Sequence, residues 1–328
     1  MVASLLREDR RLRLLSLAAA LVVTAAGASA LEVETREFAL PKESGAIALA
    51  VDPRDDGPVW VVLQQAGALV RLDPRTGVIE QIGLGEGSAP SGVALDRNGA
   101  PWVADGGRNA MLRIDPTSRD VRSWPLPENA GYAELNAVTF DARGRLWFSG
   151  QTGIYGRLDP ATGEIRLWDA PAPASIVSAP SGRIAFLSTT DSFVGSVDPD
   201  NGTVERVVPP APWQGPRRLA IDAGGNLYVT EWNVGRLNRW DAATRSWTSW
   251  LLPAVRARPF AVHAAEDGGV WIGEATANAL LRFDPADRSF QAVGFSRPFA
   301  DARQIASRGR EIWTAEYGAD RVAVRRIK

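Results

Sequence analysis

The sequence predicts an all-β protein, a seven-bladed β-propeller with four-stranded blades. An aromatic residue in an apolar context recurs seven times at spacings of 39 to 45 residues, at Trp60, Trp102, Trp147, Phe186, Tyr228, Trp271 and Trp313. An Asp that opens a turn follows each of the first six after 12 or 13 residues, at Asp73, Asp115, Asp159, Asp198, Asp241 and Asp284. Equal units of this length, each rich in short strands and turns, are typical of propeller blades.

Each unit carries signals for four short strands joined by tight turns. Alternating segments such as SGVALD (91–96) and RRLAID (217–222) predict a first strand, and the aromatic segment predicts a second. Runs such as DPRTG (73–77) predict a hairpin, because Asp and Pro set the turn and Gly accepts positive φ. An apolar or aromatic position nine residues beyond the Asp marks the closing strand. No segment after residue 30 has a helical period.

The seventh unit supplies only three strands, RQIAS (303–307), EIWTAEYG (311–318) and RVAVRRIK (321–328). The missing strand should carry an aromatic residue three positions before a Pro, and FALP (38–41) has this spacing. We therefore expect the N-terminal strand to complete the last blade. Such closure removes the unpaired sheet edge that an open ring would expose.

The first thirty residues predict a secretory signal peptide. A basic start with Arg7, Arg10, Arg11 and Arg13 precedes the apolar run LLSLAAALVV (14–23) and an Ala28-Ser29-Ala30 cleavage site. The run is shorter than the ~20 residues of a membrane-spanning helix, which favours cleavage over anchoring. We therefore expect a signal peptide at 1–30 and a single propeller domain at 31–328. The protein would be periplasmic or secreted from a bacterium, with no membrane contact after cleavage.

Charge and composition exclude some function classes. The chain has 37 Lys and Arg against 38 Asp and Glu, and residues 1–30 hold four of the basic and two of the acidic residues, so the mature net charge is about −3. Nucleic acid is therefore not an expected partner. Cysteine is absent, which a large core permits even in an oxidising compartment. Nothing in the units requires more than a monomer.

The face at which the first strands of the blades begin is the expected ligand site. In a propeller these strands line a central channel, where polar groups from every blade converge. The starting positions are Ile47, Ser91, Asn136, Ser175, Arg217, Phe260 and Arg303, and acidic residues end the second strands at Asp105, Glu231, Glu274 and Glu316. We expect Ser91, Asn136, Arg217 and Phe260 to contact a small-molecule ligand.

The sequence leaves two roles open for the charged residues of this face. The Glu residues either cap turns and pair with Arg of neighbouring blades, or hold a hard cation such as Mg²⁺ or Ca²⁺. Arg217 and Arg303 either pair with those carboxylates or bind an anionic ligand. The single histidine, His263, is expected to pack within its blade, on the side of the strand opposite Phe260.

The units PSGVALDRNGAPWVAD (90–105), RRLAIDAGGNLYVTEWNVGRLNRWD (217–241) and RPFAVHAAEDGGVWIGEATANALLRFDP (258–285) resemble the repeats of the virginiamycin B lyase family. The resemblance covers residues 34–328 and implies the same blade number and terminal closure. It also implies an activity, the opening of streptogramin B esters by elimination with Mg²⁺ and a His general base.

Arg303 and Phe260 occupy the two positions at which that family has histidine. Arginine stays protonated at physiological pH, so Arg303 is not a general base. The resemblance matches Asp301 to an acidic residue before the last family His, and Glu316 to a family Glu. It implies catalytic positions at Arg303, Glu316 and Asp301, and a metal site made by Glu274, Glu316 and Asp301. Mg²⁺ is the expected ion, with Ca²⁺ as the alternative.

Three functions follow as hypotheses. The first is an exported, divalent-metal-dependent carbon–oxygen lyase that opens a lactone or ester. The second is a non-catalytic periplasmic propeller that binds a small molecule or an envelope protein at the channel face. The third is a lactone hydrolase similar to gluconolactonases, with Ca²⁺ held by residues such as Asn136, Asp105 and Glu316. A WD-repeat scaffold is disfavoured because the GH…WD signature is missing.

Overall fold

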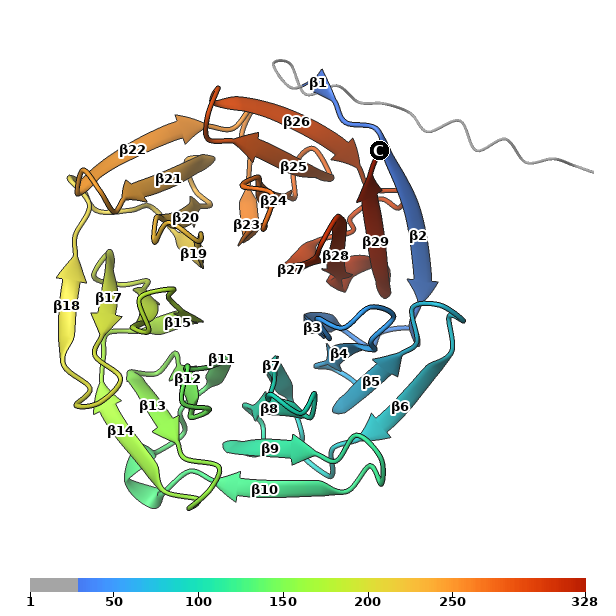
Figure 1. Cartoon of the computed structure of the whole chain (residues 1–328), viewed down its shortest axis with the longest axis vertical. Helices are drawn as coiled ribbons and strands as arrows, with labels where there is room; N and C mark the ends of the chain where they lie inside the picture. Colours follow the sequence, from blue (N-terminus) through green and yellow to red (C-terminus); the bar gives the residue numbers. More distant parts are fainter. Residues whose placement is uncertain (1–28) are drawn as a thin grey trace, which may run out of the picture.

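Seven antiparallel sheets surround a central channel in the computed structural model, which describes residues 29–328 (Figure 1). Six of the sheets have four strands, and the remaining sheet gains a short fifth strand from the N-terminal segment. Each of the first six blades in chain order runs from an innermost strand at the channel to an outermost strand at the rim. The predicted fold class is confirmed.

The strands of the blades follow the chain order. Blade 1 comprises β3 (Ala46–Val51), β4 (Val59–Leu63), β5 (Ala68–Leu72) and β6 (Ile79–Gly83), and blade 2 comprises β7 (Pro90–Leu95), β8 (Pro101–Asp105), β9 (Ala110–Ile114) and β10 (Val121–Pro125). Blade 3 comprises β11 (Leu135–Phe140), β12 (Leu146–Gly150), β13 (Ile154–Leu158) and β14 (Ile165–Asp169), and blade 4 comprises β15 (Pro173–Ser178), β16 (Ile184–Ser188), β17 (Phe193–Val197) and β18 (Val204–Val207).

Blades 5 to 7 complete the ring. Blade 5 comprises β19 (Pro216–Ile221), β20 (Leu227–Glu231), β21 (Arg236–Asp241) and β22 (Ser246–Leu251), and blade 6 comprises β23 (Pro259–Ala264), β24 (Val270–Glu274), β25 (Ala279–Asp284) and β26 (Ser289–Gly294). Blade 7 comprises β27 (Ala302–Arg308), β28 (Glu311–Glu316), β29 (Arg321–Ile327) and the N-terminal β2 (Val33–Ala39). Two 3₁₀ turns, η1 (Glu128–Ala130) and η2 (Tyr317–Ala319), lie in connecting loops.

The seven repeated aromatic residues form the contacts between blades. Each lies on the second strand of its blade and is at most 2% exposed. Trp60, for example, packs with Val103 and Leu112 of the next blade. Burial of such large rings supplies much of the apolar area that holds neighbouring sheets together, which accounts for an aromatic residue at this position in all seven units.

The predicted Asp turns form as expected. Asp73 Oδ1 accepts hydrogen bonds from the backbone N–H groups of Arg75 and Thr76, at 2.9 and 3.2 Å, and Gly77 follows with φ of 78°. Asp115 and Asp241 accept equivalent bonds. The side-chain oxygen replaces a backbone acceptor, so the repeated Asp fixes each outer hairpin.

The N-terminal strand closes the ring, as the sequence predicted. β2 pairs antiparallel with β29 from Val33 opposite Ile327 to Ala39 opposite Arg321, and it forms the outer strand of blade 7. Phe38 is 5% exposed and stacks on Trp313 with ring centroids 6.0 Å apart. Segments from the two ends of the domain therefore share one sheet and one hydrophobic cluster.

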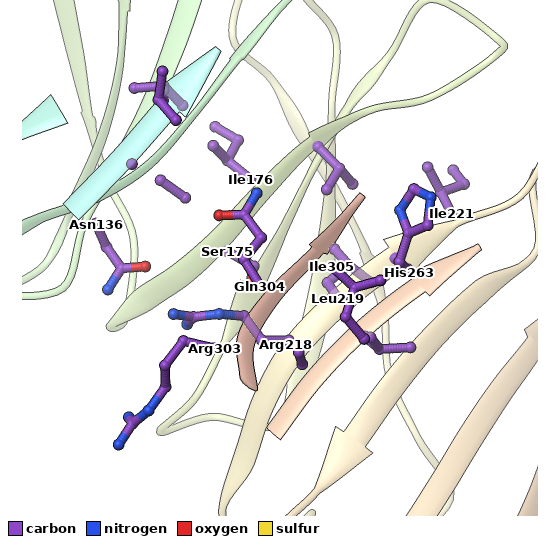
Figure 2. Close-up of a pocket in the computed structure, with 18 of the residues that line it drawn as sticks. Asn136, Ser175, Ile176, Arg218, Leu219, Ile221, His263, Arg303, Gln304 and Ile305 are labelled. Carbon is purple, nitrogen blue, oxygen red and sulfur yellow. The ribbon is translucent and has the colours of Figure 1, made fainter. Parts of the chain in front are cut away.

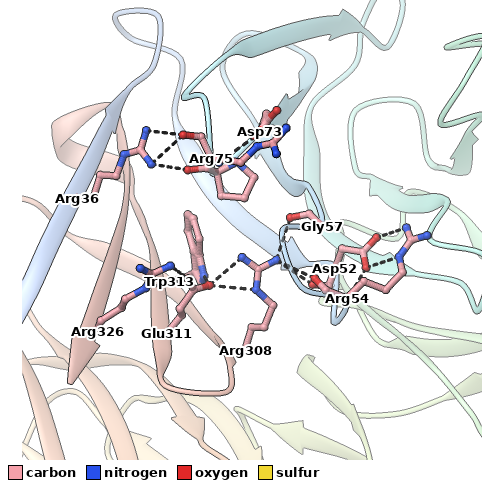
Figure 3. Close-up of polar contacts among 11 residues, drawn as sticks. Arg36, Asp52, Arg54, Gly57, Asp73, Arg75, Arg308, Glu311, Trp313 and Arg326 are labelled. Carbon is pink, nitrogen blue, oxygen red and sulfur yellow. Dashed lines mark hydrogen bonds and ion pairs between the residues drawn. The ribbon is translucent and has the colours of Figure 1, made fainter. Parts of the chain in front are cut away.

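A polar network crosses the seam between blades 7 and 1 (Figure 3). Arg308 Nη1 donates to the carbonyl oxygens of Asp52, Arg54 and Gly57 at 3.2, 3.2 and 2.9 Å, while its Nη2 donates to Glu311 Oε2 at 2.8 Å. Arg36 on β2 donates to carbonyls of the β5–β6 turn. The side chains thus tie the last blade to the first on the outside of the shared core.

Every innermost strand contains a register irregularity next to its first residue. Six of the shifts fall at Ala46/Ala48, Pro90/Gly92, Leu135/Ala137, Pro173/Ser175, Pro259/Val262 and Ala302/Gln304, and the seventh falls at Pro216/Leu219. A bulge leaves an extra residue outside the ladder and redirects its side chain. It is these redirected residues that occupy the mouth of the channel.

Residues 1–28, and with them nearly all of the predicted signal peptide, lie outside the described residues. The last two residues of that predicted peptide form β1 (Ser29–Ala30), which pairs in parallel with β26. Within residues 29–328, no helix is long and apolar enough to cross a membrane.

Candidate functional site

A cavity of about 210 Å³ occupies the channel inside the ring of innermost strands. Residues from six of the seven blades, blades 2 to 7, line it. Its polar lining residues are Ser91, Asn136, Ser175, Arg218, His263, Arg303 and Gln304. Figure 2 shows the side chains of Arg218, Arg303, Asn136 and Gln304 at one end of this space and the ring of His263 at the other.

The structure places the four predicted ligand-contacting residues at or beside this cavity. Ser91 and Asn136 line it directly, whereas Arg217 and Phe260 do not line it and directly precede the lining residues Arg218 and Ala261 in the chain. The Ser91 hydroxyl already donates to the Leu135 carbonyl at 2.5 Å, so it joins blades 2 and 3 rather than waiting for a ligand. On the side of the cavity formed by blades 2 and 3, Asn136 is then the polar side chain that can contact a ligand.

Phe260 forms an aromatic platform on which arginines rest. The Cζ of Arg303 lies 4.5 Å and that of Arg218 lies 4.9 Å from the centroid of its ring. The Cζ of Arg217 is 6.0 Å from the same centroid and 5.2 Å from that of Trp232. Cation–π contacts of this kind hold guanidinium groups in place without neutralising them.

Arg303 has its own counter-ion. Its Nη2 donates to Asp301 Oδ2 at 2.5 Å, and its Nε donates to the same oxygen at 2.8 Å. Its guanidinium also lies 5.1 Å from the centroid of Tyr317. Of the two roles that the sequence left open for Arg303, the structure shows an ion pair, although the partner is Asp301 rather than a Glu of the second strands.

Arg218 is the site residue that the sequence reasoning missed. The bulge in β19 releases it into the cavity beside Arg217. Among residues 29–328 its guanidinium has no carboxylate within ion-pair distance and makes one hydrogen bond, a long one of 3.4 Å from Nη1 to the Arg217 carbonyl, while its backbone N–H donates to Thr230 Oγ1 at 3.2 Å. Burial, together with the positive charges of Arg303 and Arg217, lowers the pKa of Arg218 to about 10. The only sequence signal was the Arg-Arg dipeptide at the start of an inner strand.

The acidic residues at the second-strand ends have structural partners. Glu274 accepts backbone N–H groups from Arg258 at 2.6 Å, Thr276 at 2.9 Å and Ala277 at 2.5 Å. Asp105 and Glu231 likewise accept the N–H of Ala89 and of Gln214 in the preceding interblade loop. These carboxylates fasten the loop that leads into their blade, which is the capping role that the sequence left open.

Glu316 departs from this pattern, because its Oε1 pairs with Arg325 Nη2 at 3.0 Å inside blade 7. Glu274, Glu316 and Asp301 therefore each have a different protein partner, and within the described residues no group of three or more potential metal ligands converges. This donor set does not fit a divalent cation, which needs several oxygen atoms around one point. Binding of Mg²⁺ or Ca²⁺ by these residues stays an untested prediction.

His263 lines the cavity instead of packing wholly within its blade. Its Nε2 lies 2.8 Å from Ser307 Oγ on β27, so the ring bridges blades 6 and 7. Burial lowers the pKa of His263 to about 4, against a smaller opposing effect of Asp267. The imidazole is therefore neutral at physiological pH and adds no charge to the channel.

The loops and inner-strand starts of this face are divided by charge. Blades 5 to 7 carry six arginines, Arg217, Arg218, Arg256, Arg258, Arg297 and Arg303, against Asp301 and Asp320. Blades 1 to 4 carry Lys42 and Arg108 against five acids, Glu43, Glu86, Glu128, Glu134 and Asp191. The two loop acids of blades 5 to 7 are engaged, Asp301 by Arg303 and Asp320 by backbone N–H groups near Ser44. With the second-strand carboxylates Glu231, Glu274 and Glu316 and the Arg325 that pairs with Glu316 included, blades 5 to 7 have seven arginines against five acids, so a small positive excess remains on the side of the mouth that holds Arg218.

Solved structures match the whole ring. Virginiamycin B lyase from Staphylococcus aureus superposes with a TM-score of 0.82 at 20% identity, covering 90% of this chain and 100% of the other. A streptogramin B lyase superposes with a TM-score of 0.81, also at 20% identity, covering 90% and 98%. The chain has the fold of the streptogramin lyases. The resemblance predicted from the repeats is thereby confirmed for the fold, and identities this low show the fold alone.

Other propellers match almost as completely. YCF48 bound to D1 peptide superposes with a TM-score of 0.74 at 15% identity, covering 92% of this chain and 99% of the other. No protein-family model and no curated protein sequence matches the chain. The fold is therefore shared by lyases and by a protein bound to a peptide, and the site itself must carry the argument about function.

Proposed function

We propose that this protein is a non-catalytic binding propeller that takes a small anionic molecule into the mouth of its channel. The observation that carries the proposal is Arg218, a half-buried guanidinium that lines the cavity and has no carboxylate partner among the described residues. A buried charge is costly unless it is paired. An anionic ligand would supply the missing partner.

The surroundings of Arg218 support an anion. The small excess of arginine in blades 5 to 7 would attract negatively charged molecules toward the mouth, and the acids of this sector already have partners within the protein. The cavity is also partly shielded from water, which strengthens a charge-assisted hydrogen bond inside it. The same features disfavour a cationic ligand.

The mouth lacks a group suited to removing a proton from a substrate. Arg303 and Phe260 stand at the positions that the family resemblance assigns to histidine, and neither is a base. His263 has a pKa of about 4 and shares its Nε2 with Ser307, which makes it a weak base at neutral pH. Glu274 is saturated by backbone N–H groups. Binding without turnover is the function that this arrangement supports best.

Isothermal titration calorimetry with the purified protein tests the proposal. The probes are sodium benzoate, sodium acetate and inorganic phosphate as anions, with tetramethylammonium and benzyl alcohol as cationic and neutral controls. We expect at least one anion to bind and both controls to fail. Binding should be lost in Arg218→Met and retained in Arg245→Met, an exposed arginine in a hairpin turn of blade 5. Equal heats for anions and controls would refute an anion site.

A carbon–oxygen lyase is the second candidate, because the fold match to the streptogramin lyases spans the whole ring. The test is incubation of a streptogramin B ester with the protein and Mg²⁺, with and without a chelator. Elimination breaks the C–O bond and leaves the mass unchanged, whereas hydrolysis by a lactonase adds one water, so chromatography with mass detection separates the two enzyme hypotheses. Chelator-sensitive turnover of either kind would replace the binding proposal with an enzyme.

The proposal includes export and a monomeric state. Both rest on the sequence, through the predicted signal peptide at 1–30 and the self-contained closure of the ring by β2. The intact mass of protein recovered from the periplasm or medium should correspond to a chain that begins at Leu31. Light scattering on that material should give the mass of one chain.

A further inference from the structure

We propose that the anion is a monocarboxylate with an apolar body, bound with its carboxylate at Arg218 and its body deeper in the channel. This inference rests on the proposed function and narrows it to a class of ligand. Three properties of the cavity carry it: its net charge, the hydrogen-bonding groups at its mouth and the apolar residues beneath them.

The cavity holds one uncompensated positive charge. Arg303 is paired with Asp301, and Arg217 is exposed and lies over Trp232, which leaves Arg218 as the unpaired cation that lines the space. His263 at the other end is neutral. A monoanion therefore balances the half-buried charge of Arg218, whereas a dianion such as a phosphate monoester would bring in a second charge without a partner.

The groups around Arg218 match a carboxylate. A guanidinium presents a planar fork of N–H donors that suits the two oxygens of one carboxylate. Figure 2 shows that the Arg218 guanidinium points across the channel toward the wall of Asn136, with the Gln304 amide on the same side. The two amides can donate to the remaining lone pairs of the carboxylate, so the mouth can satisfy all of its acceptors.

An apolar ring lies directly below these polar groups. On each of the six inner strands that line the cavity, the position that corresponds to Leu219, the residue after Arg218, is aliphatic. These residues are Val93, Val138, Ile176, Leu219, Val262 and Ile305. These side chains keep from 4% to 9% of their surface exposed. Burial of a ligand's apolar body against them would contribute roughly 25 cal/mol per Å² of apolar surface removed from water.

The size of the cavity limits that body. About 210 Å³ is below the ~300–1,000 Å³ of a typical drug-sized pocket. A short aliphatic or single-ring aromatic acid fits this volume better than a macrocycle or an oligosaccharide. The neutral His263–Ser307 pair at the far end can accept a weakly polar tail but offers no second charge.

A calorimetric series on the purified full protein tests the inference, with benzoate, acetate, inorganic phosphate and benzamide as probes. We expect benzoate to bind at least ten-fold more tightly than acetate, and benzamide, its neutral analogue, not to bind. Arg218→Met should weaken the affinity for benzoate by about 10- to 100-fold. Arg218→Lys keeps the charge but not the planar fork of donors, so its affinity for benzoate should lie between that of the parent and that of Arg218→Met.

A second variant separates the apolar body from the charge. Ile176→Thr places a hydroxyl in the aliphatic ring and should weaken benzoate while leaving acetate unchanged. Melting curves of each variant confirm that it is folded, and Arg245→Met is the matched control. If phosphate binds more tightly than benzoate, anion binding stands and the carboxylate inference fails. If no anion binds at all, the inference and the proposed function fail together.

Discussion

Arg325 and Glu316 form an ion pair in blade 7, with 3.0 Å between Arg325 Nη2 and Glu316 Oε1, and both side chains are at most 1% exposed. Thr314 bridges them, accepting from Arg325 Nη1 at 2.8 Å and donating to Glu316 Oε1 at 2.9 Å. The guanidinium also lies over the ring of Phe295 at 4.9 Å. The carboxylate that the family resemblance assigns to catalysis thus belongs to a buried structural network.

Removal of the Glu316 carboxylate should destabilise the protein strongly. Glu316→Ala leaves Arg325 as an unpaired buried cation, which typically costs about 3–5 kcal/mol. Urea unfolding followed by tryptophan fluorescence measures the change. Glu266→Ala, at an exposed position in a loop of blade 6, is the control and should alter stability by less than about 0.5 kcal/mol. A Glu316→Ala protein as stable as the parent, but with lost Mg²⁺ affinity, would instead support the metal prediction.

Deletion of the N-terminal strand should destabilise the whole ring. Without residues 34–41 the β29 edge loses most of its ladder, and the cluster shared by Phe38 and Trp313 opens. We expect one cooperative transition at a clearly lower melting temperature. A chain lacking only residues 1–30 is the control, because β2 stays intact in it. An unchanged melting temperature after the longer deletion would contradict closure by β2.

The fold was predictable because each blade repeats the same local chemistry. The buried aromatic of the second strand and the Asp turn recur in the sequence at fixed distances, and the spacing of FALP revealed the closing strand. The residues at the channel mouth were less accessible, since a bulge has no residue signature of its own. In blade 4, Pro173 pairs with Ser188 and Ser175 pairs with Leu187. The residue left outside the ladder is therefore Ala174, and not Ser175 as the repeat count gave.

The same bulges explain which site residues the sequence could not predict. Counting from the repeat located Asn136 and Arg303, but it gave no reason to look one residue further, at Arg218 or Gln304. The sequence also did not predict which group each charged side chain would pair with. Whether Arg303 meets Asp301 or a ligand depends on the direction of the redirected side chain, which only the three-dimensional arrangement fixes.

Replacement of Arg218 by Met should stabilise the ligand-free protein. The change removes a half-buried, unpaired cation that also lies near the charge of Arg303, and it keeps a flexible side chain over Phe260. We expect a gain of about 1–2 kcal/mol in the free energy of unfolding, as is common when a binding residue is replaced. Unfolding in urea without added anions measures it. A loss of stability would mean that Arg218 already has a partner.

Titration of His263 should make the protein less stable as the pH falls from 6.5 to 4. The folded-state pKa of about 4 lies below the ordinary value of 6.5, so in this window the unfolded chain binds a proton that the folded protein does not. The difference corresponds to a loss of about 3 kcal/mol at pH 4, and only about 0.4 kcal/mol more is lost from this group below that pH. His263→Gln keeps a partner for Ser307 but does not titrate. Because His263 is the only histidine, the difference in pH slope between the parent and His263→Gln isolates its contribution. Equal slopes in urea unfolding at pH 7, 5.5 and 4 would show that the folded protein protonates this imidazole as readily as the unfolded chain does.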